Sequence, residues 1–239
     1  MVAEKIYNFE PDFVVIPGDT LLETIESIGI SQAELAKRTG RPLKTINGII
    51  KGNVAITPET ALQLEKVLRV PANFWINLES NYRQALARQR EKDELSNKIE
   101  WLEKFPVNEI VKLGFIKKAK DKTEQLKELL KFFGVASIES WEEVWETNVA
   151  FRKSEAFKTD YNSIAAWVRM VEIQAQQLEC KPYDKEKFKN AIDEIRGITK
   201  EVNPDIFIPE VKRICAEAGV AVVFIPELRG CRASGVTKW

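Results

Sequence analysis

The chain has 239 residues, with 36 Lys and Arg against 36 Asp and Glu, no His and three Cys, and 44% of its positions are hydrophobic. This length and composition allow a buried core in one or two domains, which excludes a disordered or fibrous protein. Without imidazole, a Ser-His-Asp triad, a Cys-His pair and an H-E-x-x-H zinc site are all excluded. We therefore expect a protein that is not an enzyme, with no catalytic residue, no bound metal and no cofactor.

The apolar runs of the chain are short. The longest, residues 220–225, is well below the ~18 to 20 residues that span a bilayer, and residues 1–5 show no signal-peptide hydrophobic region. We expect a cytoplasmic protein with no membrane partner. The odd number of cysteines and the lack of C-x-x-C spacing favour reduced, buried thiols over disulfides or a zinc knuckle at Cys180, Cys215 and Cys231.

Charge is distributed unevenly along the chain. Residues 1–28 carry six acids against one base, whereas residues 29–92 carry eleven bases against five acids. Because polyanion binding depends on the local patch and not on the net charge of the chain, this second segment is expected to attract phosphate groups.

Two short helices are predicted first. One covers residues 19–28, ends at Gly29, and places its apolar residues on one face: Leu21, Leu22, Ile25 and Ile28. The next starts at Ser31, because Ser31 and Glu34 form a capping box in which each side chain satisfies a main-chain donor of the other. This second helix ends at Gly40.

Three more helices follow in the same segment. The third covers residues 43–51, and Gly52 closes it in the C′ position. Thr57 as N-cap and Pro58 at the first helical position open the fourth. The fifth begins at Pro71. The segment from residue 19 to about 80 is therefore predicted to hold five helices.

The second and third helices have the internal spacing of a helix-turn-helix. Counting Gln32 as position one puts Ala36 at five, Gly40 at nine and Ile46 at fifteen. The small Ala allows close crossing of the two helices, Gly permits a positive φ in the turn, and Ile fills the space between them.

Several motifs in this segment carry a family resemblance. They are P-G-D-T-L-L at residues 17–22, G-I-S-Q-A-E-L-A at residues 29–36, I-T-P-E-T-A-L at residues 56–62, and F-W-I-N-L at residues 74–78 followed by Tyr82. Over roughly residues 14–90 the chain resembles the HigA-type antitoxin branch of the phage-repressor (XRE-like) regulators. The resemblance implies a five-helix DNA-binding domain that dimerises and represses its own operon, commonly while neutralising a RelE-like ribonuclease toxin.

The resemblance also implies which residues contact DNA. Gln32 would clamp the phosphate backbone, Arg41 belongs to the same interface, and the exposed positions of the third helix would face the major groove: Leu43, Lys44, Thr45, Asn47, Gly48 and Lys51. Lys44 and Asn47 have the chemistry to read base edges, while Thr45 and Lys51 suit phosphate. For Asn47 an ordinary solvated helix position stays open as the alternative.

Two further features qualify this interface. Gly48 departs from the family pattern, which often has a longer polar side chain there, so a base contact is missing or replaced. The aromatic residues of the fifth helix, Phe74, Trp75 and Tyr82, are expected to pack in the core.

Residues 83–150 are predicted to form a helical linker region behind a first domain at residues 1–82. Residues 83–105 are highly charged, which indicates a long solvated helix that Pro106 ends. Shorter helices are predicted at residues 107–113, 123–133 and 140–145. None of them carries a catalytic constellation.

The last predicted region is a partial α+β domain at residues 151–239. Helices are expected at residues 162–178, 184–196 and 208–217, followed by a buried strand at residues 220–225 and the beginning of another at residues 234–239. Such a strand pair would leave open edges, where we expect fraying and proteolysis.

This last region resembles the N-terminal part of the ImmA/IrrE metallopeptidase-like domain. The resemblance rests on F-R-K-S at residues 151–154, A-W-V-R at residues 166–169 and C-A-E-A-G-V-A-V-V-F at residues 215–224. The zinc helix of that family would lie beyond Trp239, so the resemblance carries over no catalytic or metal residue.

The sequence thus predicts a mainly α protein: a five-helix phage-repressor-like helix-turn-helix domain, a helical linker and an incomplete α+β C-terminal domain. The expected function is that of a repressor of antitoxin type, a homodimer that binds a palindromic operator in double-stranded DNA and has a toxin as a further partner. One alternative is a regulatory fragment of a zinc-metallopeptidase regulator whose catalytic part lies beyond Trp239. Another is an interaction module, in which residues 91–239 bind a toxin or a sensor ligand.

Overall fold

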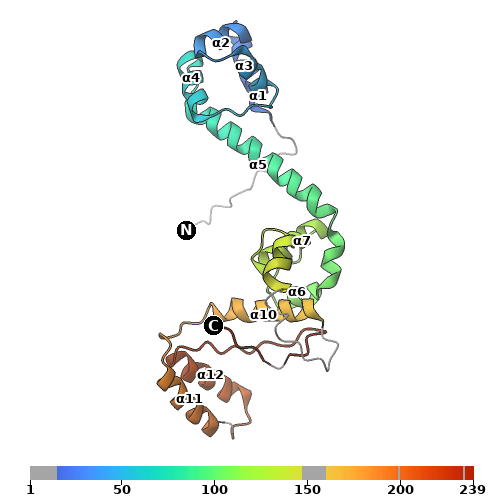
Figure 1. The fold of residues 1–239 in the computed structure, drawn as a ribbon, viewed down its shortest axis with the longest axis vertical. Coiled ribbons are helices and arrows are strands. Elements are labelled where there is room, and N and C mark those ends of the chain that lie inside the picture. The colour runs from blue at the N-terminus through green and yellow to red at the C-terminus, as the bar shows by residue number, and fades with distance from the viewer. Residues whose placement is uncertain (1–14, 147–159, 199, 234) are drawn as a thin grey trace, which may run out of the picture. The chain divides into compact units, whose positions relative to one another are not determined.

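The computed structural model describes residues 15–146, 160–198, 200–233 and 235–239. The described part of the chain is mainly helical and contains no strand (Figure 1). It divides into two compact units, Met1–Glu94 and Leu95–Trp239, called unit 1 and unit 2 below. None of the helices in the described ranges is long and apolar enough to cross a membrane.

Unit 1 holds the five helices that the sequence predicts. They are α1 (Pro17–Ser27), α2 (Gln32–Thr39), α3 (Leu43–Ile50), α4 (Pro58–Leu68) and α5 (Ala72–Ser96), the last of which extends past the unit boundary. Each agrees with the predicted position to within two residues at its start. Ile28, which the sequence places on the same face as Leu21 and Ile25, lies just beyond the end of α1 and is 50% exposed.

Local capping fixes the helix ends in unit 1. The hydroxyl of Ser31 accepts the N–H of Glu34 at 3.2 Å, and that of Thr57 accepts the N–H of Thr60 at 3.3 Å. Gly40 ends α2 with φ 67°, in the left-handed region that favours glycine. The reciprocal half of the predicted capping box is replaced, because the Glu34 carboxylate accepts Arg38 Nε at 2.8 Å.

The start of α1 lies directly against the end of α3. A Cβ atom at Gly18 would lie 2.2 Å from the carbonyl oxygen of Ile50 and 2.4 Å from that of Ile49, so no side chain fits there. Pro17 occupies the first turn, where its missing N–H costs no helical hydrogen bond. The Pro-Gly pair therefore allows close contact between the two helices.

The core of unit 1 is small and mostly aliphatic. It consists of Leu21, Ile25, Leu35, Ala36, Ile46, Ile49, Ile56, Ala61, Leu64, Leu68, Ala72 and Trp75. Of the aromatic residues predicted in the core, Trp75 is fully buried, Tyr82 is half-buried, and Phe74 is 45% exposed. Phe74 packs edge-on against Trp75 from the surface, with 5.2 Å between ring centroids.

Unit 2 is built from short helices and a larger core. The elements are η1 (Ile99–Lys104), α6 (Val107–Lys112), α7 (Lys122–Phe133), α8 (Ile138–Trp141), η2 (Glu142–Glu146), α10 (Tyr161–Ala175), α11 (Lys185–Ile198) and α12 (Pro204–Glu217). Aromatic side chains pack edge to face around Trp141 of α8: Trp101 of η1, Phe105 directly after η1 and Phe133 of α7 all lie within 5.6 Å between centroids.

The predicted strand at residues 220–225 is wrong, and with it the incomplete α+β description. These residues form no strand and are half-exposed or exposed, not buried. A β-branched run becomes a strand only when a neighbouring strand satisfies its main-chain groups. Here the N–H of Val220 bonds instead to the carbonyl oxygen of Cys215 at the end of α12. Residues 235–239 are likewise irregular.

The segment after residue 224 contributes two buried side chains to the core of unit 2. Leu228 is 1% exposed and Cys231 is 2% exposed, and both belong to the main cluster. The N–H of Arg229 donates to Glu109 Oε2 at 2.8 Å, while its carbonyl oxygen accepts the hydroxyl of Ser163 at 2.9 Å. The open strand edges expected from the sequence are therefore absent from the described part of this segment.

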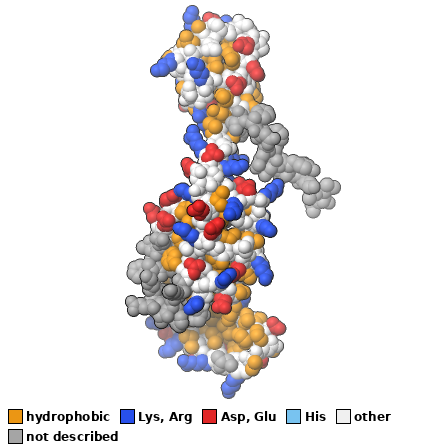
Figure 2. Space-filling view, turned by 90° about the vertical axis from the view of Figure 1, so that its right-hand side faces the viewer, with side chains coloured by type: hydrophobic (Ala, Val, Ile, Leu, Met, Phe, Trp, Pro, Cys, Tyr) orange, Lys and Arg blue, Asp and Glu red, His pale blue; other side chains and the backbone are white. Residues whose placement is uncertain are grey.

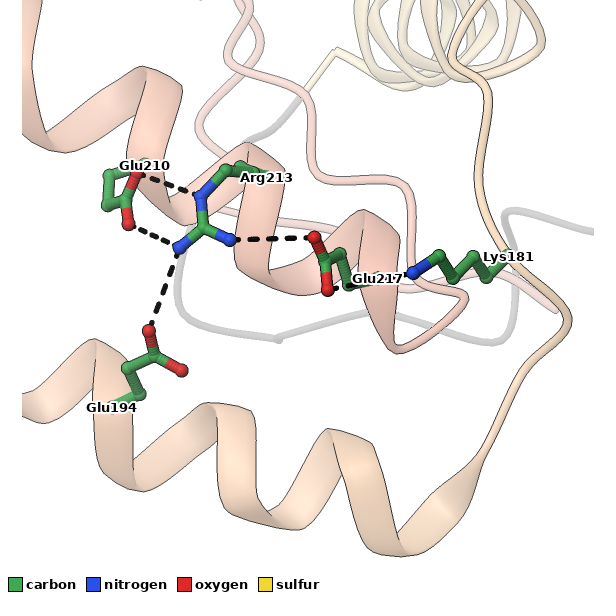
Figure 3. Close-up of polar contacts among 5 residues, drawn as sticks. All are labelled: Lys181, Glu194, Glu210, Arg213 and Glu217. Atoms are coloured by element: carbon green, nitrogen blue, oxygen red, sulfur yellow. Dashed lines mark hydrogen bonds and ion pairs between the residues drawn. The ribbon is translucent and has the colours of Figure 1, made fainter.

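Helices α11 and α12 form a pair with its own small core of Ala191, Ile214 and Ala218. On its surface the Arg213 guanidinium contacts Glu210 at 2.5 Å, Glu217 at 3.5 Å and, across the helix pair, Glu194 at 3.7 Å (Figure 3). The hydrogen bond from Arg213 lowers the pKa of the Glu210 carboxyl. Because all these groups are exposed, solvent screens the pairs and each contributes little stability.

Two other predictions need correction in this part of the chain. Helix α12 begins at Pro204, four residues before the predicted start, because Asn203 caps it and Pro209 is accommodated within the helix. Cys215 and Cys231 are buried free thiols as expected, but Cys180 is exposed. The F-R-K-S motif at residues 151–154 lies outside the described residues.

Candidate nucleic-acid interface

Helices α2 and α3 pack against each other in the arrangement that their spacing predicts. Ala36 on α2 is 5% exposed and Ile46 on α3 is fully buried between the helices and the rest of the core. Gly40 provides the positive φ of the turn. With α2 packed behind it and its own first turn outside, α3 has the geometry of a recognition helix.

The outer face of α3 carries four of the predicted DNA-binding residues. Lys44 and Lys51 are exposed, Leu43 is 45% exposed, and Thr45 is half-buried at the first turn. Lys44 and Lys51 lie seven residues apart, two helical turns along the same face. This face offers two cations, one apolar side chain and one hydroxyl to a ligand in front of it.

Asn47 and Gly48 face inward more than the other predicted residues. The amide oxygen of Asn47 is buried and has no hydrogen-bond partner among the described residues. A Cβ atom at Gly48 would lie 2.5 Å from Val54 Cγ2, and the carbonyl oxygen of Gly48 accepts the N–H groups of Asn53 and Val54. The absence of a longer side chain at Gly48 is therefore explained by the turn that folds back over it.

Gln32 and Arg41 lie at the two ends of α2. Gln32 is the first residue of the helix and is half-buried, near the end whose free N–H groups suit an anion. Arg41 is half-buried as well, and its Nε donates to Gln63 Oε1 on α4 at 2.7 Å. The structure therefore gives Arg41 a bracing contact between the turn and α4 in addition to any role toward DNA.

Charges around this interface favour an anion. In Figure 2, blue Lys and Arg side chains lie at the top and left of unit 1, and red carboxylates lie to its right. The exposed cations of α2 and α3 are Lys37, Arg38, Lys44 and Lys51, against one half-buried acid, Glu34, which is paired with Arg38. On the neighbouring α4, a hydrogen bond from the Thr57 hydroxyl lowers the pKa of Glu59.

One buried residue next to the interface was missed in the sequence. Glu79 on α5 is 8% exposed and accepts hydrogen bonds from the N–H of Ile56 and from Arg83. The available signal was its helical register: Glu79 lies four residues after Trp75, on the buried face, with Arg83 four residues further on. Nothing in that register indicates the partner at Ile56, which is 23 residues away.

A family model described as Helix-turn-helix matches residues 21–75. Residues 21–75 are a helix-turn-helix domain. The match covers α1 to α4 and the first residues of α5, so it includes the core of unit 1 and the complete α2–turn–α3 arrangement.

Three relatives of this helix-turn-helix domain can be compared with the chain. The uncharacterized HTH-type transcriptional regulator YddM of Escherichia coli (strain K12) is 29% identical over 73 residues, which are 30% of this chain and 78% of that protein. An addiction module antidote protein of the HigA family from Coxiella burnetii is 28% identical, with a TM-score of 0.33, over 35% of this chain and 92% of that one. The Pseudomonas aeruginosa antitoxin HigA, solved with the higBA promoter, is 28% identical, with a TM-score of 0.34, over 36% of this chain and 94% of that one.

These similarities cover about a third of the chain and give no support to the resemblance of residues 151–239 to the ImmA/IrrE domain. Among the described residues, no group of three or more His, Cys, Asp or Glu side chains is placed to hold a metal ion.

Proposed function

We propose that this protein is a sequence-specific DNA-binding transcriptional repressor that binds a palindromic operator as a homodimer and regulates its own operon. The observation that carries the proposal is the exposed face of α3, on which Leu43, Lys44 and Lys51 project from a helix braced by α2. The name of the E. coli relative, an HTH-type transcriptional regulator, supports the same class of function.

In this proposal α3 enters the major groove. Lys44, exposed in the first turn, donates hydrogen bonds to guanine O6 and N7. Gln32, Thr45 and Lys51 contact phosphates on either side, which fixes the register of the helix in the groove. Asn47 reads a base with its amide nitrogen, because its oxygen is turned inward.

Dimerisation gives the operator its symmetry. A two-fold pair of helix-turn-helix domains places its recognition helices about one helical turn of DNA apart, roughly 34 Å. The operator is then a palindrome whose half-sites are separated by about 10 base pairs from centre to centre.

Binding to the DNA upstream of the gene that encodes this chain tests the proposal. We expect fluorescence anisotropy to show binding to this duplex at least about a thousandfold tighter than to a random duplex of equal length, and a steep loss of affinity with salt. Sedimentation should give two chains per operator. Equal affinity for both duplexes at moderate salt would contradict the proposal.

The resemblance of residues 14–90 to HigA-type antitoxins supports a further part of the proposal, in which the protein neutralises a RelE-like ribonuclease toxin. The test is co-expression with the product of the neighbouring reading frame. Formation of a stable complex that abolishes growth inhibition by that product supports this role. Growth inhibition that persists despite equal expression of this chain would contradict it.

A further inference from the structure

The connection between α3 and α4 is held at both of its ends by a single turn of α5. The N–H of Ile56 donates to Glu79 Oε2 at 3.1 Å. Arg83 Nε donates to the other carboxylate oxygen of Glu79 at 2.6 Å, and Arg83 Nη2 lies 3.5 Å from the carbonyl oxygen of Gly52. The start and the end of the connection therefore share one pair of side chains.

Because Glu79 is buried, its carboxylate needs well-placed hydrogen-bond partners. The side chain of Glu79 is 10% exposed, and a buried carboxylate is costly unless its oxygens are hydrogen-bonded and its charge is paired. Here one oxygen accepts a main-chain N–H and the other accepts the guanidinium of Arg83. Because neither oxygen is free, a shift of the connection relative to α5 breaks one of these bonds.

Gly52 is enclosed from the same side. Its φ of 71° lies in the left-handed region, and a Cβ atom there would lie 3.0 Å from the Tyr82 hydroxyl. The Arg83 guanidinium in turn lies 5.2 Å from the centroid of the Tyr82 ring. Side chains of α5 thus enclose the residue at which the chain leaves the recognition helix.

The connection starts with a residue of the proposed interface. Lys51 is the C-cap of α3, is exposed, and directly precedes Gly52. Because Arg83 and Tyr82 contact Gly52, the turn that follows Lys51 is fixed against α5 at the point where the Lys51 side chain leaves the end of α3. We propose that Glu79 and Arg83 are positioning residues that hold Lys51 against the DNA phosphates, an inference that rests on the proposed function.

The main test compares two substitutions with the same change of charge. Glu79→Gln keeps an acceptor for the N–H of Ile56 but loses the ion pair with Arg83. The control, Glu34→Gln, breaks an ion pair of the same spacing on α2, away from the connection. In that pair, Glu34 and Arg38 lie 2.8 Å apart. Each removes one negative charge, which by itself strengthens binding to DNA. A weaker affinity in Glu79→Gln alone therefore reports a loss of position.

We expect Glu79→Gln in the full chain to bind the upstream duplex about tenfold more weakly, the size of a lost charge-assisted hydrogen bond, with the salt slope reduced by about 1. Glu34→Gln should bind more tightly than the wild type, because it removes the acid of the interface and releases Arg38 from its ion pair. In Glu79→Gln, adding Lys51→Ala should cost little more, because the phosphate contact is already lost. Losses that multiply in the double variant would overturn the inference, as would equal affinities of Glu79→Gln and Glu34→Gln.

If Glu79→Gln folds poorly, the affinity of Arg83→Lys for DNA and the hydrogen exchange of the Ile56 amide test the same role. Arg83→Lys preserves the charge but cannot reach Glu79 and Gly52 together, so it should also weaken binding with a reduced salt slope. Without DNA, hydrogen exchange at the Ile56 amide should be faster in both variants than in the wild type. Unchanged affinity of a folded Arg83→Lys overturns the positioning role alone. A wild type that binds the upstream and random duplexes equally overturns the proposed function and this inference together.

Discussion

The cores of the two units differ in the kinds of side chains they contain. They also differ in how far apart in the sequence their residues lie. In unit 1 the described core is aliphatic apart from Trp75, and its residues all come from a segment of 55 positions between Leu21 and Trp75. In unit 2, seven of the described core residues are Trp or Phe, and the cluster extends from Leu95 to Cys231. Unit 1 is thus assembled from neighbouring helices, whereas unit 2 depends on contacts between distant segments.

This difference decides which contacts determine each structure. In unit 1 the ends of α2 and α4 are set by hydrogen bonds between residues three positions apart. In unit 2 the C-terminal segment is held by the bond between Arg229 and Glu109, 120 positions apart, and by that between Ser163 and Arg229, 66 positions apart. Disturbing such distant contacts in unit 2 should therefore affect segments that are not neighbours in sequence.

The largest effect is expected at Leu228 in unit 2. Leu228→Ala removes a side chain that is 1% exposed and leaves a cavity in the main core, which should cost about 3 to 4 kcal/mol of unfolding free energy. Chemical denaturation followed by tryptophan fluorescence measures it. If the C-terminal segment were an open, frayed edge, the loss would stay below about 1 kcal/mol.

The next effect sharpens the comparison from the side of unit 1. Gly18→Ala places a Cβ atom 2.2 to 2.4 Å from main-chain atoms of Ile49 and Ile50, which cannot move aside as a flexible side chain can. We expect a loss of about 3 kcal/mol, at the upper end of overpacking effects. Amide hydrogen exchange in the full chain measures this loss of stability and shows which unit it affects. A loss confined to unit 2 would contradict the packing described.

The sequence predicts unit 1 better than unit 2, because the contacts of unit 1 are mostly local and those of unit 2 join distant segments. Ser31 and Thr57 are recognisable as N-cap residues and Gly40 as a C-cap residue. The five helices of unit 1 and the exposed face of α3 were therefore predictable. The buried site of Glu79 was not, because its partner Ile56 lies 23 positions away, and the irregular structure of residues 220–225 was not, because the sequence does not show whether a strand lies beside them. A run such as residues 220–225 has the composition of a strand, and only the absence of a pairing neighbour prevents one.

An intermediate effect concerns binding by unit 1. Lys44→Ala should cost roughly 1 to 3 kcal/mol on the specific duplex if Lys44 reads bases, and much less on random DNA. Asn47→Ala should cost less than Lys44→Ala, because the Asn47 oxygen is turned inward. Anisotropy titrations on both duplexes give the values. Equal losses on the two duplexes would make Lys44 a phosphate contact.

The smallest effect is expected for the same glycine-to-alanine change at a position where the added Cβ atom meets no other part of the fold. Gly197 lies in α11 of unit 2, and a Cβ atom built on it would have no heavy atom within 4 Å apart from its chain neighbours and the backbone of its own helix. Glycine within a helix costs roughly 0.5 to 1 kcal/mol of stability relative to alanine, because glycine has more backbone freedom in the unfolded chain and loses more of it on folding. Gly197→Ala should therefore stabilise the chain by about 0.5 kcal/mol, somewhat less than the full value because Gly197 lies next to the end of the helix. A gain in denaturation midpoint for Gly197→Ala and a loss for Gly18→Ala would show that space, and not helical propensity, decides the sign. A loss at both positions would mean that α11 is held in unit 2 by contacts that its exposed Gly197 does not reveal.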